Sequence, residues 1–272
     1  MQESYDRETI AMTGIESRRI VGMNVDATNY ERTTSAVVEW SQRGQSRYIC
    51  VATVNNAMES FDNPEFQRVM NQADLVTPDG MPLVWGLRLL GVSHATRTYG
   101  PDLTPVVLKA AEALGIAVGF FGASQTVLEA LLIEVRQRFP RVRISYAYSP
   151  PFRQLTSAED RRVVDDVNRS GCRILFVGLS TPKQEYWMAA HRPGVQAVML
   201  GVGAAFDFLA GTKPQAPRWI MRIGLEWLFR LATEPRRLWK RYVKHNPRFL
   251  FLFALQLLGW DVCKFASRTG NA

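Results

Sequence analysis

Among the acidic residues, Asp79 has the position most typical of a catalytic side chain. It follows a predicted strand and lies between Pro78 and Gly80. Two interpretations fit this position. Asp79 can cap the helix predicted after it, because an aspartate there accepts backbone N–H bonds worth about 1 kcal/mol. It can also act as a general base that takes the proton of a sugar hydroxyl attacking an activated glycosyl donor. The two roles are compatible, and spacing alone slightly favours the cap.

Three further side chains could bind a polar ligand beside this acid. Thr53 and Asn55 follow the strand that ends near Ala52. Their side chains can exchange hydrogen bonds with sugar hydroxyls or phosphate oxygens, or simply cap the loop. Arg97, with Asp102 close behind it, could bind a phosphate. Its alternatives are a solvated surface charge or an ion pair with Asp102.

Residues 178–185, GLSTPKQE, follow the strongest predicted strand. Ser180 or Thr181 is expected to cap a helix whose first-turn proline is Pro182. The free N–H groups and positive dipole end of that helix would then face the ligand, as an anion site for a nucleotide diphosphate. Gln184 would lie in its first turn.

Short apolar runs alternate with amphipathic segments through residues 19–211. The runs are β-branched and continuous, as expected for strands buried on both faces of a parallel sheet. The alternation predicts an α/β fold, a doubly wound, Rossmann-like, mostly parallel sheet. Predicted strands cover residues 48–53, 73–77, 116–122, 142–148, 173–179 and 196–203. Predicted helices cover residues 28–43, 101–114, 125–139, 158–169 and 182–191.

Open parallel sheets bind ligands at the carboxyl ends of their strands, so five strand-end turns are expected to share one crevice. A tight turn explains each glycine alone almost as well. The turns are residues 53–55, 78–80, 122–124, 178–180 and 201–203, and Gly203 and Asp207 bracket the end of the last strand.

Familiar phosphate and metal signatures are absent from the sequence. It contains neither GxGxxG nor GxxxxGK[ST], no DxD-type pair of acids in a strand-end loop, and no histidine spacing typical of metal ligands. We therefore expect no metal and no cofactor, with arginines and helix termini stabilising a leaving diphosphate. The three cysteines are scattered, which suits a reducing compartment.

The net charge of +8 lies in one stretch, since ten basic and two acidic residues between Lys213 and Arg248 account for all of it. We therefore expect an anionic partner that contacts this one stretch of the chain. Aromatic residues beside basic ones suit a helix at an anionic membrane surface. Nucleic-acid binding, or an ordinary aromatic core with a solvated basic face, are the alternatives. The aromatic residues are Trp219, Trp227, Phe229, Trp239, Tyr242, Phe249, Phe251 and Phe253.

Composition divides the chain into a polar tail (1–18), an α/β catalytic core (19–211) and a basic, helical appendage (212–272). Pro235 is predicted to end one helix and begin the next. The N-terminal stretch lacks the apolar run of a secretory signal. No run reaches the roughly 20 apolar residues that cross a bilayer, the nearest being residues 249–260. We expect a cytoplasmic protein, peripherally associated with the inner face of the membrane.

Longer runs resemble the WecG/TagA/CpsF family of glycosyltransferases over roughly residues 20–250. They are ADLVTPDGMPLVWGLRLLG, RTYGPDL, LFVGLSTPKQEYW and the stretch from GVGAAFDFLAG to NPRFL. The family often reads RVAGSD where this chain has residues 97–102, so Tyr99 replaces a small residue.

The resemblance implies an inverting, metal-independent transfer of a sugar from a UDP-sugar to a polyprenyl-diphosphate-linked saccharide, in cell-surface polysaccharide biosynthesis. By position, Asp79 matches the proposed base. Thr53, Asn55, Arg97 and Gln184 match pocket residues. Gly122, Gly203 and Asp207 fall where the nucleotide is expected, and Ser124 and Gly178 complete that set. The appendage could bind the lipid diphosphate through three arginines, Arg218, Arg222 and Arg230.

Two other hypotheses about function remain. A non-catalytic, nucleotide-binding, membrane-associated protein could use the same fold, and a nucleic-acid-binding protein would use the basic segment. We expect no nucleic-acid partner. The sequence is compatible with a homo-oligomer and leaves the donor sugar open.

Overall fold

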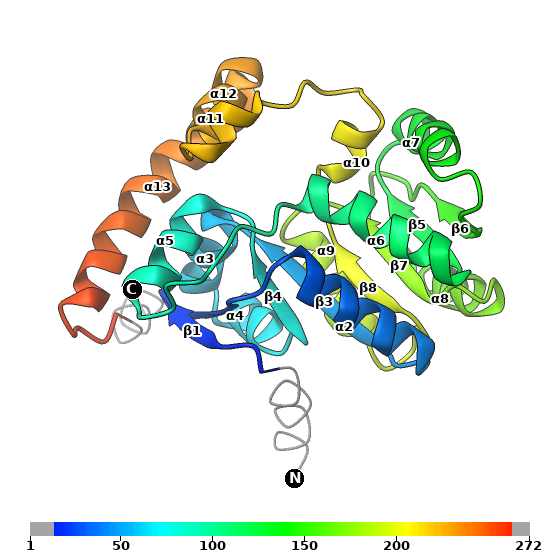
Figure 1. Cartoon of the computed structure of the whole chain (residues 1–272), viewed down its shortest axis with the longest axis horizontal. Helices are drawn as coiled ribbons and strands as arrows, with labels where there is room; N and C mark the ends of the chain where they lie inside the picture. Colours follow the sequence, from blue (N-terminus) through cyan, green and yellow to red (C-terminus); the bar gives the residue numbers. More distant parts are fainter. Residues whose placement is uncertain (1–13, 263–272) are drawn as a thin grey trace, which may run out of the picture.

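The computed structural model describes residues 14–262, except the side chain of Arg222. Its centre is a six-stranded sheet with the order β4-β3-β8-β7-β5-β6 (Figure 1). All of its pairings are parallel, as predicted. The strands are β3 (Arg47–Ala52), β4 (Leu75–Pro78), β5 (Val118–Gly122), β6 (Ile144–Tyr148), β7 (Ile174–Gly178) and β8 (Val198–Gly201).

Both faces of this sheet are buried, because successive side chains of a strand point to opposite faces. In β3, Tyr48, Cys50 and Ala52 join one hydrophobic cluster, and Ile49 and Val51 join the other. The first cluster includes α3 (Val54–Asp62), α4 (Pro64–Asn71), α5 (Met81–Leu89), α8 (Ser157–Arg169) and α9 (Lys183–His191). The second includes α2 (Tyr30–Gln42), α6 (Gly100–Leu114), α7 (Gln125–Arg138) and α10 (Ala205–Leu209). The predicted arrangement with helices on both faces is confirmed.

A small antiparallel hairpin precedes the sheet and was not predicted. Its strands are β1 (Ser17–Ile20) and β2 (Met23–Asp26). The turn between them holds Val21 and Gly22 at positive φ. The hairpin begins at Ser17, inside the stretch expected to be a tail, and residues 1–13 lie outside the described part of the chain.

The C-terminal segment forms α11 (Arg218–Arg222), α12 (Glu226–Thr233) and α13 (Pro235–Leu257). Pro235 begins α13 as predicted, and the helix continues through Pro247, so the apolar stretch after it is no separate element. Figure 1 shows α13 running along one edge of the molecule beside α3 and α5.

The later part of α13 belongs to the hydrophobic core. Phe249 and Phe253 are buried among the side chains of the first cluster, and their rings stack with centroids 5.9 Å apart. Gln256 accepts a hydrogen bond from the Val21 amide at 2.8 Å and donates one to the Arg19 carbonyl at 2.6 Å. The C-terminal segment is therefore anchored both to the hydrophobic core and to the N-terminal hairpin.

Candidate active site

The pairing of β3 with β4 brings the first two predicted site residues together. Ala52 and Pro78 are register partners at the carboxyl ends of these strands, so Thr53 and Asp79 follow side by side. The Asp79 amide donates to the Ala52 carbonyl at 2.8 Å. The hydroxyl of Thr53 donates to Asn56 Oδ1 at 3.0 Å, which fixes it at the start of α3. Both side chains are thus positioned by local backbone structure.

Asp79 is not a helix cap. The cap of α5 is Gly80, with no side-chain hydrogen bond. Asp79 Oδ1 instead accepts from Arg97 Nη2 at 3.0 Å, and Oδ2 from the Gly100 amide at 3.4 Å. Arg97 Nε also donates to the Asp79 carbonyl. The carboxylate is therefore held by the loop that leads into α6, with Oδ2 the less tightly bound oxygen.

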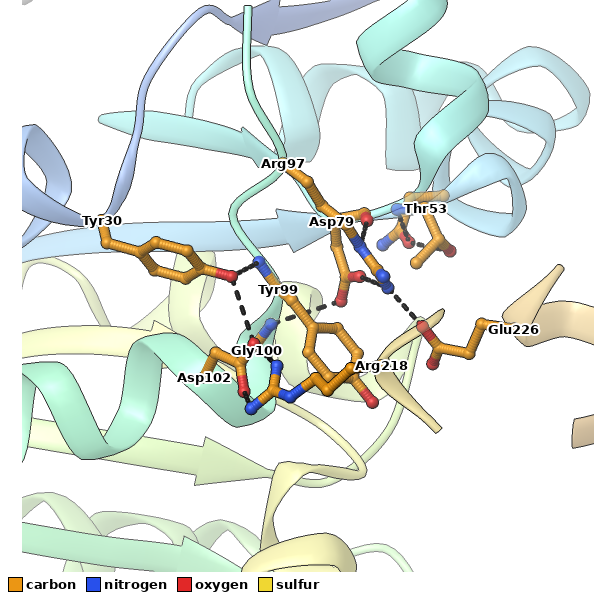
Figure 2. Close-up of polar contacts among 10 residues, drawn as sticks. Tyr30, Thr53, Asp79, Arg97, Tyr99, Gly100, Asp102, Arg218 and Glu226 are labelled. Carbon is orange, nitrogen blue, oxygen red and sulfur yellow. Dashed lines mark hydrogen bonds and ion pairs between the residues drawn. The ribbon is translucent and has the colours of Figure 1, made fainter. Parts of the chain in front are cut away.

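Arg97 joins Asp79 to the C-terminal segment (Figure 2). Its Nη2 donates to Glu226 Oε2 at 2.5 Å, across 129 residues of sequence. The three side chains are only 10 to 16% exposed. The guanidinium carbon lies 4.2 Å from the centre of the Tyr99 ring, a cation–π contact. Both alternatives for Arg97, a solvated charge and an ion pair with Asp102, are wrong.

Burial raises the pKa of Asp79, the positive charge of Arg97 opposes this, and the nearby Glu226 carboxylate raises it further. Burial lowers the pKa of Arg97, but the two carboxylates outweigh that effect and raise it. Arg97 therefore stays a cation between two acids, and Asp79, when ionised, is a stronger base than an exposed aspartate.

Asp79, Arg97 and Glu226 line a cavity of about 260 Å³. Its polar lining comes from the strand ends, α3, α12 and the first half of α13, and its apolar lining from α5 and the second half of α13. The polar residues include Thr53, Asn55, Asp79, Arg97, Glu226, Arg230, Arg241 and His245, and the apolar residues Met81, Pro82, Trp85, Phe249 and Leu250. The cavity can hold a ligand with a charged part and an apolar part.

A second cavity of about 740 Å³ lies at the ends of β5 and β7. Aromatic rings and two cations line it, among them Trp187, Tyr186, Phe152, Lys183 and Arg153. Gly178 and Ser180 line this cavity, whereas Thr53 and Asp79 line the first. Four of the five turns expected to share one crevice are thus distributed over two cavities, and the fifth, residues 201–203, lines neither of them.

Several predicted residues support the backbone of this region. A Cβ on Gly122 would lie 2.5 Å from the Gly178 backbone, and one on Gly178 would lie 2.6 Å from the Phe206 ring. Only glycine permits this close approach of the β5 and β7 ends. Ser124 caps α7 by accepting from the Val127 amide.

The predicted catalytic residue Gln184 and the predicted nucleotide residues Gly203 and Asp207 lie near the end of β8 or beyond it. Gln184 is buried, and its Oε1 has no hydrogen-bond partner among the described residues. This oxygen lies 3.6 Å from where a Cβ on Gly203 would be. Asp207 forms an ion pair with Lys213 at 3.3 Å. Gln184, Gly203 and Asp207 line neither of the two cavities.

The predicted cap of α9 is wrong. This helix begins at Lys183 with Pro182 as its cap residue, and no side chain caps it. Thr181 donates to Glu185 at 2.9 Å instead, and Asn56 donates to the same oxygen at 3.0 Å. The bond from Asn56 to Glu185 therefore joins α3 to α9.

Of the three arginines expected at the lipid diphosphate, the structure describes the side chains of two, and of these Arg230 lines the first cavity. Arg218 forms a two-point ion pair with Asp102 at 2.5 and 3.0 Å (Figure 2). The Arg222 side chain lies outside the described residues. Glu226, Arg241 and His245 were missed, because nothing local marks which side of a basic helix faces the site.

In the described part of the chain, no three His, Cys, Asp or Glu side chains gather in a way that could hold a metal ion. Across residues 14–262, no helix is both long and apolar enough to cross a membrane.

Open parallel α/β sheets bind ligands at the carboxyl ends of their strands, and the cavity that Asp79 lines lies at this edge. The profile of the glycosyl transferase WecG/TagA/CpsF family matches residues 18–261, so the chain belongs to this family of glycosyltransferases.

Two curated relatives bear the name N-acetylglucosaminyldiphosphoundecaprenol N-acetyl-beta-D-mannosaminyltransferase. The protein from Bacillus spizizenii is 32% identical over 200 residues, which cover 73% of this chain and 76% of the relative. The protein from Staphylococcus aureus (strain NCTC 8325) is 28% identical over 240 residues, covering 86% and 91%.

Proposed function

We propose that this glycosyltransferase moves a sugar from a UDP-sugar to a polyprenyl-diphosphate-linked saccharide in cell-surface polysaccharide biosynthesis. The names of the relatives suggest N-acetylmannosamine as the transferred sugar and N-acetylglucosaminyl-diphospho-undecaprenol as the acceptor. The observation that carries the proposal is the first cavity, in which Asp79 and Arg97 face an apolar wall from α5 and α13. A prenyl diphosphate has this combination of a charged head and an apolar chain.

In the proposed reaction, Asp79 is the general base. The acceptor hydroxyl oxygen bonds to the anomeric carbon of the donor sugar as the bond from that carbon to the UDP oxygen breaks. The hydroxyl proton passes to Asp79 Oδ2, the oxygen held only by the long 3.4 Å contact with Gly100. UDP leaves with the bonding electron pair. A single displacement inverts the anomeric configuration.

Arginines are the proposed electrostatic partners of the diphosphate groups. Arg230 lines the first cavity with Arg97, and burial of such cations strengthens their interaction with developing negative charge. The proposal requires no metal. Arg218 could bind a diphosphate group only after its ion pair with Asp102 is broken.

The nucleotide is assigned to the second cavity, where Trp187 and Phe152 offer rings for base stacking and Lys183 offers a cation for phosphate. Gly178, at the rim of this cavity, lets the backbone approach closely.

The C-terminal segment is proposed to bind an anionic membrane surface peripherally, on the cytoplasmic face. Exposed apolar residues of α13 repeat at helical spacing, so they form one stripe about 120° wide. Basic residues of the same helix can bind anionic headgroups beside it. The stripe comprises Trp239, Val243, Leu250, Phe251, Leu257 and Leu258.

The test of this function is Asp79→Asn. The variant should lose transfer by about 10²- to 10⁴-fold while binding UDP as tightly as the unsubstituted chain. Transfer would be measured by product mass with UDP-N-acetylmannosamine and a short-chain prenyl-diphosphate acceptor, and UDP binding by calorimetry. Unchanged turnover would remove Asp79 from the mechanism. UDP binding without transfer in the unsubstituted chain would favour the non-catalytic alternative.

A further inference from the structure

Three buried polar atoms on the wall of the Asp79 cavity have no hydrogen-bond partner within the described chain. They are Asn55 Oδ1, Arg241 Nε and His245 Nδ1, and all three residues line this cavity. Buried polar atoms in folded proteins are nearly always paired. Three exceptions around one cavity indicate that a polar ligand completes these bonds.

The packing of α3 against α13 brings the three atoms together. Arg248 binds Asp62 at 2.6 and 2.9 Å, and His245 Nε2 lies 3.7 Å from Glu59 Oε1, so both pairs are separated by 186 residues. The two helices therefore run parallel in one register, side by side in Figure 1. One helical turn earlier, the same register pairs Asn55 with Arg241, and residues four apart share a helix face.

The types of these atoms define the ligand. Asn55 Oδ1 needs a donor, and Arg241 Nε needs an acceptor. Burial lowers the pKa of His245, so its neutral ring offers one N–H and one lone pair. A phosphate only accepts, so it would satisfy Arg241 and leave Asn55 unpaired. Sugar hydroxyl and acetamido groups both donate and accept.

We propose that Asn55, Arg241 and His245 form the subsite for the acceptor's sugar ring, with Arg241 and His245 as specificity-determining residues. This inference rests on the proposed function. The sugar is assigned to the acceptor, not the donor, because the apolar wall that suits a prenyl chain belongs to the same cavity. A sugar held here lies beside Asp79, where one of its hydroxyls can be deprotonated.

The experiment compares two ligands on the full chain by calorimetry: a short-chain prenyl diphosphate with, and without, N-acetylglucosamine. The unsubstituted chain should prefer the sugar-bearing ligand at least tenfold. Arg241→Met and His245→Phe should each reduce this preference by about fivefold to tenfold, since each removes one hydrogen bond. Affinity for the sugar-free ligand should change little. Arg236→Gln is the matched control, because it removes an exposed positive charge from the same helix.

Equal weakening of both ligands would assign these residues to the diphosphate and overturn the subsite, as would an unchanged preference. If neither ligand binds the unsubstituted chain, the proposed acceptor itself is wrong. His245→Asn, which keeps a polar atom near Nδ1, should retain more of the preference than His245→Phe at matched thermal stability. If the two behave alike, His245 does not contact the sugar.

Discussion

Glu226 and Asp79, 147 residues apart in the sequence, bind the same guanidinium, that of Arg97, from two sides (Figure 2). Glu226 belongs to α12 and Asp79 directly follows β4, so this cluster joins the C-terminal segment to the carboxyl edge of the sheet. With both acids ionised, the cluster carries one net negative charge, which affects both the basicity of Asp79 and the stability of the fold.

Glu226→Gln should shift the pH dependence of transfer. The Glu226 carboxylate raises the pKa of Asp79, and the proposed mechanism requires Asp79 to be ionised. Removing this charge lowers the pKa, so the acid limb of the kcat/KM profile should move to lower pH. Glu234→Gln, which removes an acid paired with Lys213 instead, is the control and should leave the limb in place. An acid limb that does not move in Glu226→Gln would contradict the coupling.

Arg97→Gln should destabilise the fold by about 3–5 kcal/mol, because it leaves two buried carboxylates without their cation. Arg218→Gln breaks an ion pair of similar geometry at the surface, where Arg218 is 64% exposed, and should cost about 0–1 kcal/mol. Urea unfolding near neutral pH measures both changes in unfolding free energy. Equal losses would mean that burial does not distinguish the two pairs.

Asp26→Asn should change how stability depends on pH. Burial raises the pKa of Asp26 from 3.8 to about 6. The folded state thus holds the proton more tightly, so this stabilising contribution is complete below pH 3.8 and is lost as pH rises through about 6. Asparagine does not titrate and can still accept from the Val76 amide.

Relative to the unsubstituted chain, Asp26→Asn should therefore gain about 3 kcal/mol in unfolding free energy between acidic pH and neutral pH. Chemical denaturation across that range measures the difference. Parallel stability curves for the two proteins would refute the raised pKa.

Two phenylalanines of α13 lie on different faces of the helix, one buried in the core and one exposed to solvent. Phe253 is 7% exposed, and Phe253→Ala should cost about 3–5 kcal/mol of stability. Phe251 is 65% exposed, so Phe251→Ala should change stability by less than about 0.5 kcal/mol. Phe251→Ala should instead weaken sedimentation with anionic vesicles. Unchanged vesicle binding would argue against membrane contact through this face.

Metal removal should leave transfer unchanged. In the proposed mechanism Arg97 and Arg230 stabilise the diphosphate groups, so EDTA should not lower the rate and Mg²⁺ should not restore Arg230→Gln. Product formation in chelated buffer with and without added Mg²⁺ measures this. A rate that depends on a divalent cation would overturn the metal-independent proposal.

Local sequence was enough to predict the sheet and the candidate base. Continuous β-branched runs identify strands buried on both faces, and the positions of Thr53, Asn55 and Asp79 at strand ends follow directly from where those runs stop. The β1–β2 hairpin was missed because its strands are only four residues long and its turn places Val21, a β-branched residue, at positive φ.

Tertiary structure alone decided which distant residues complete the site. Arg97 could pair with any nearby acid, and only the docking of α12 brings Glu226 to it while Asp102 pairs with Arg218. Likewise, Arg241 and His245 face the cavity because Phe249 and Phe253 fix the rotation of α13 against the core. Spacing along a helix determines which residues share a face, but the packing of that helix determines what the face contacts.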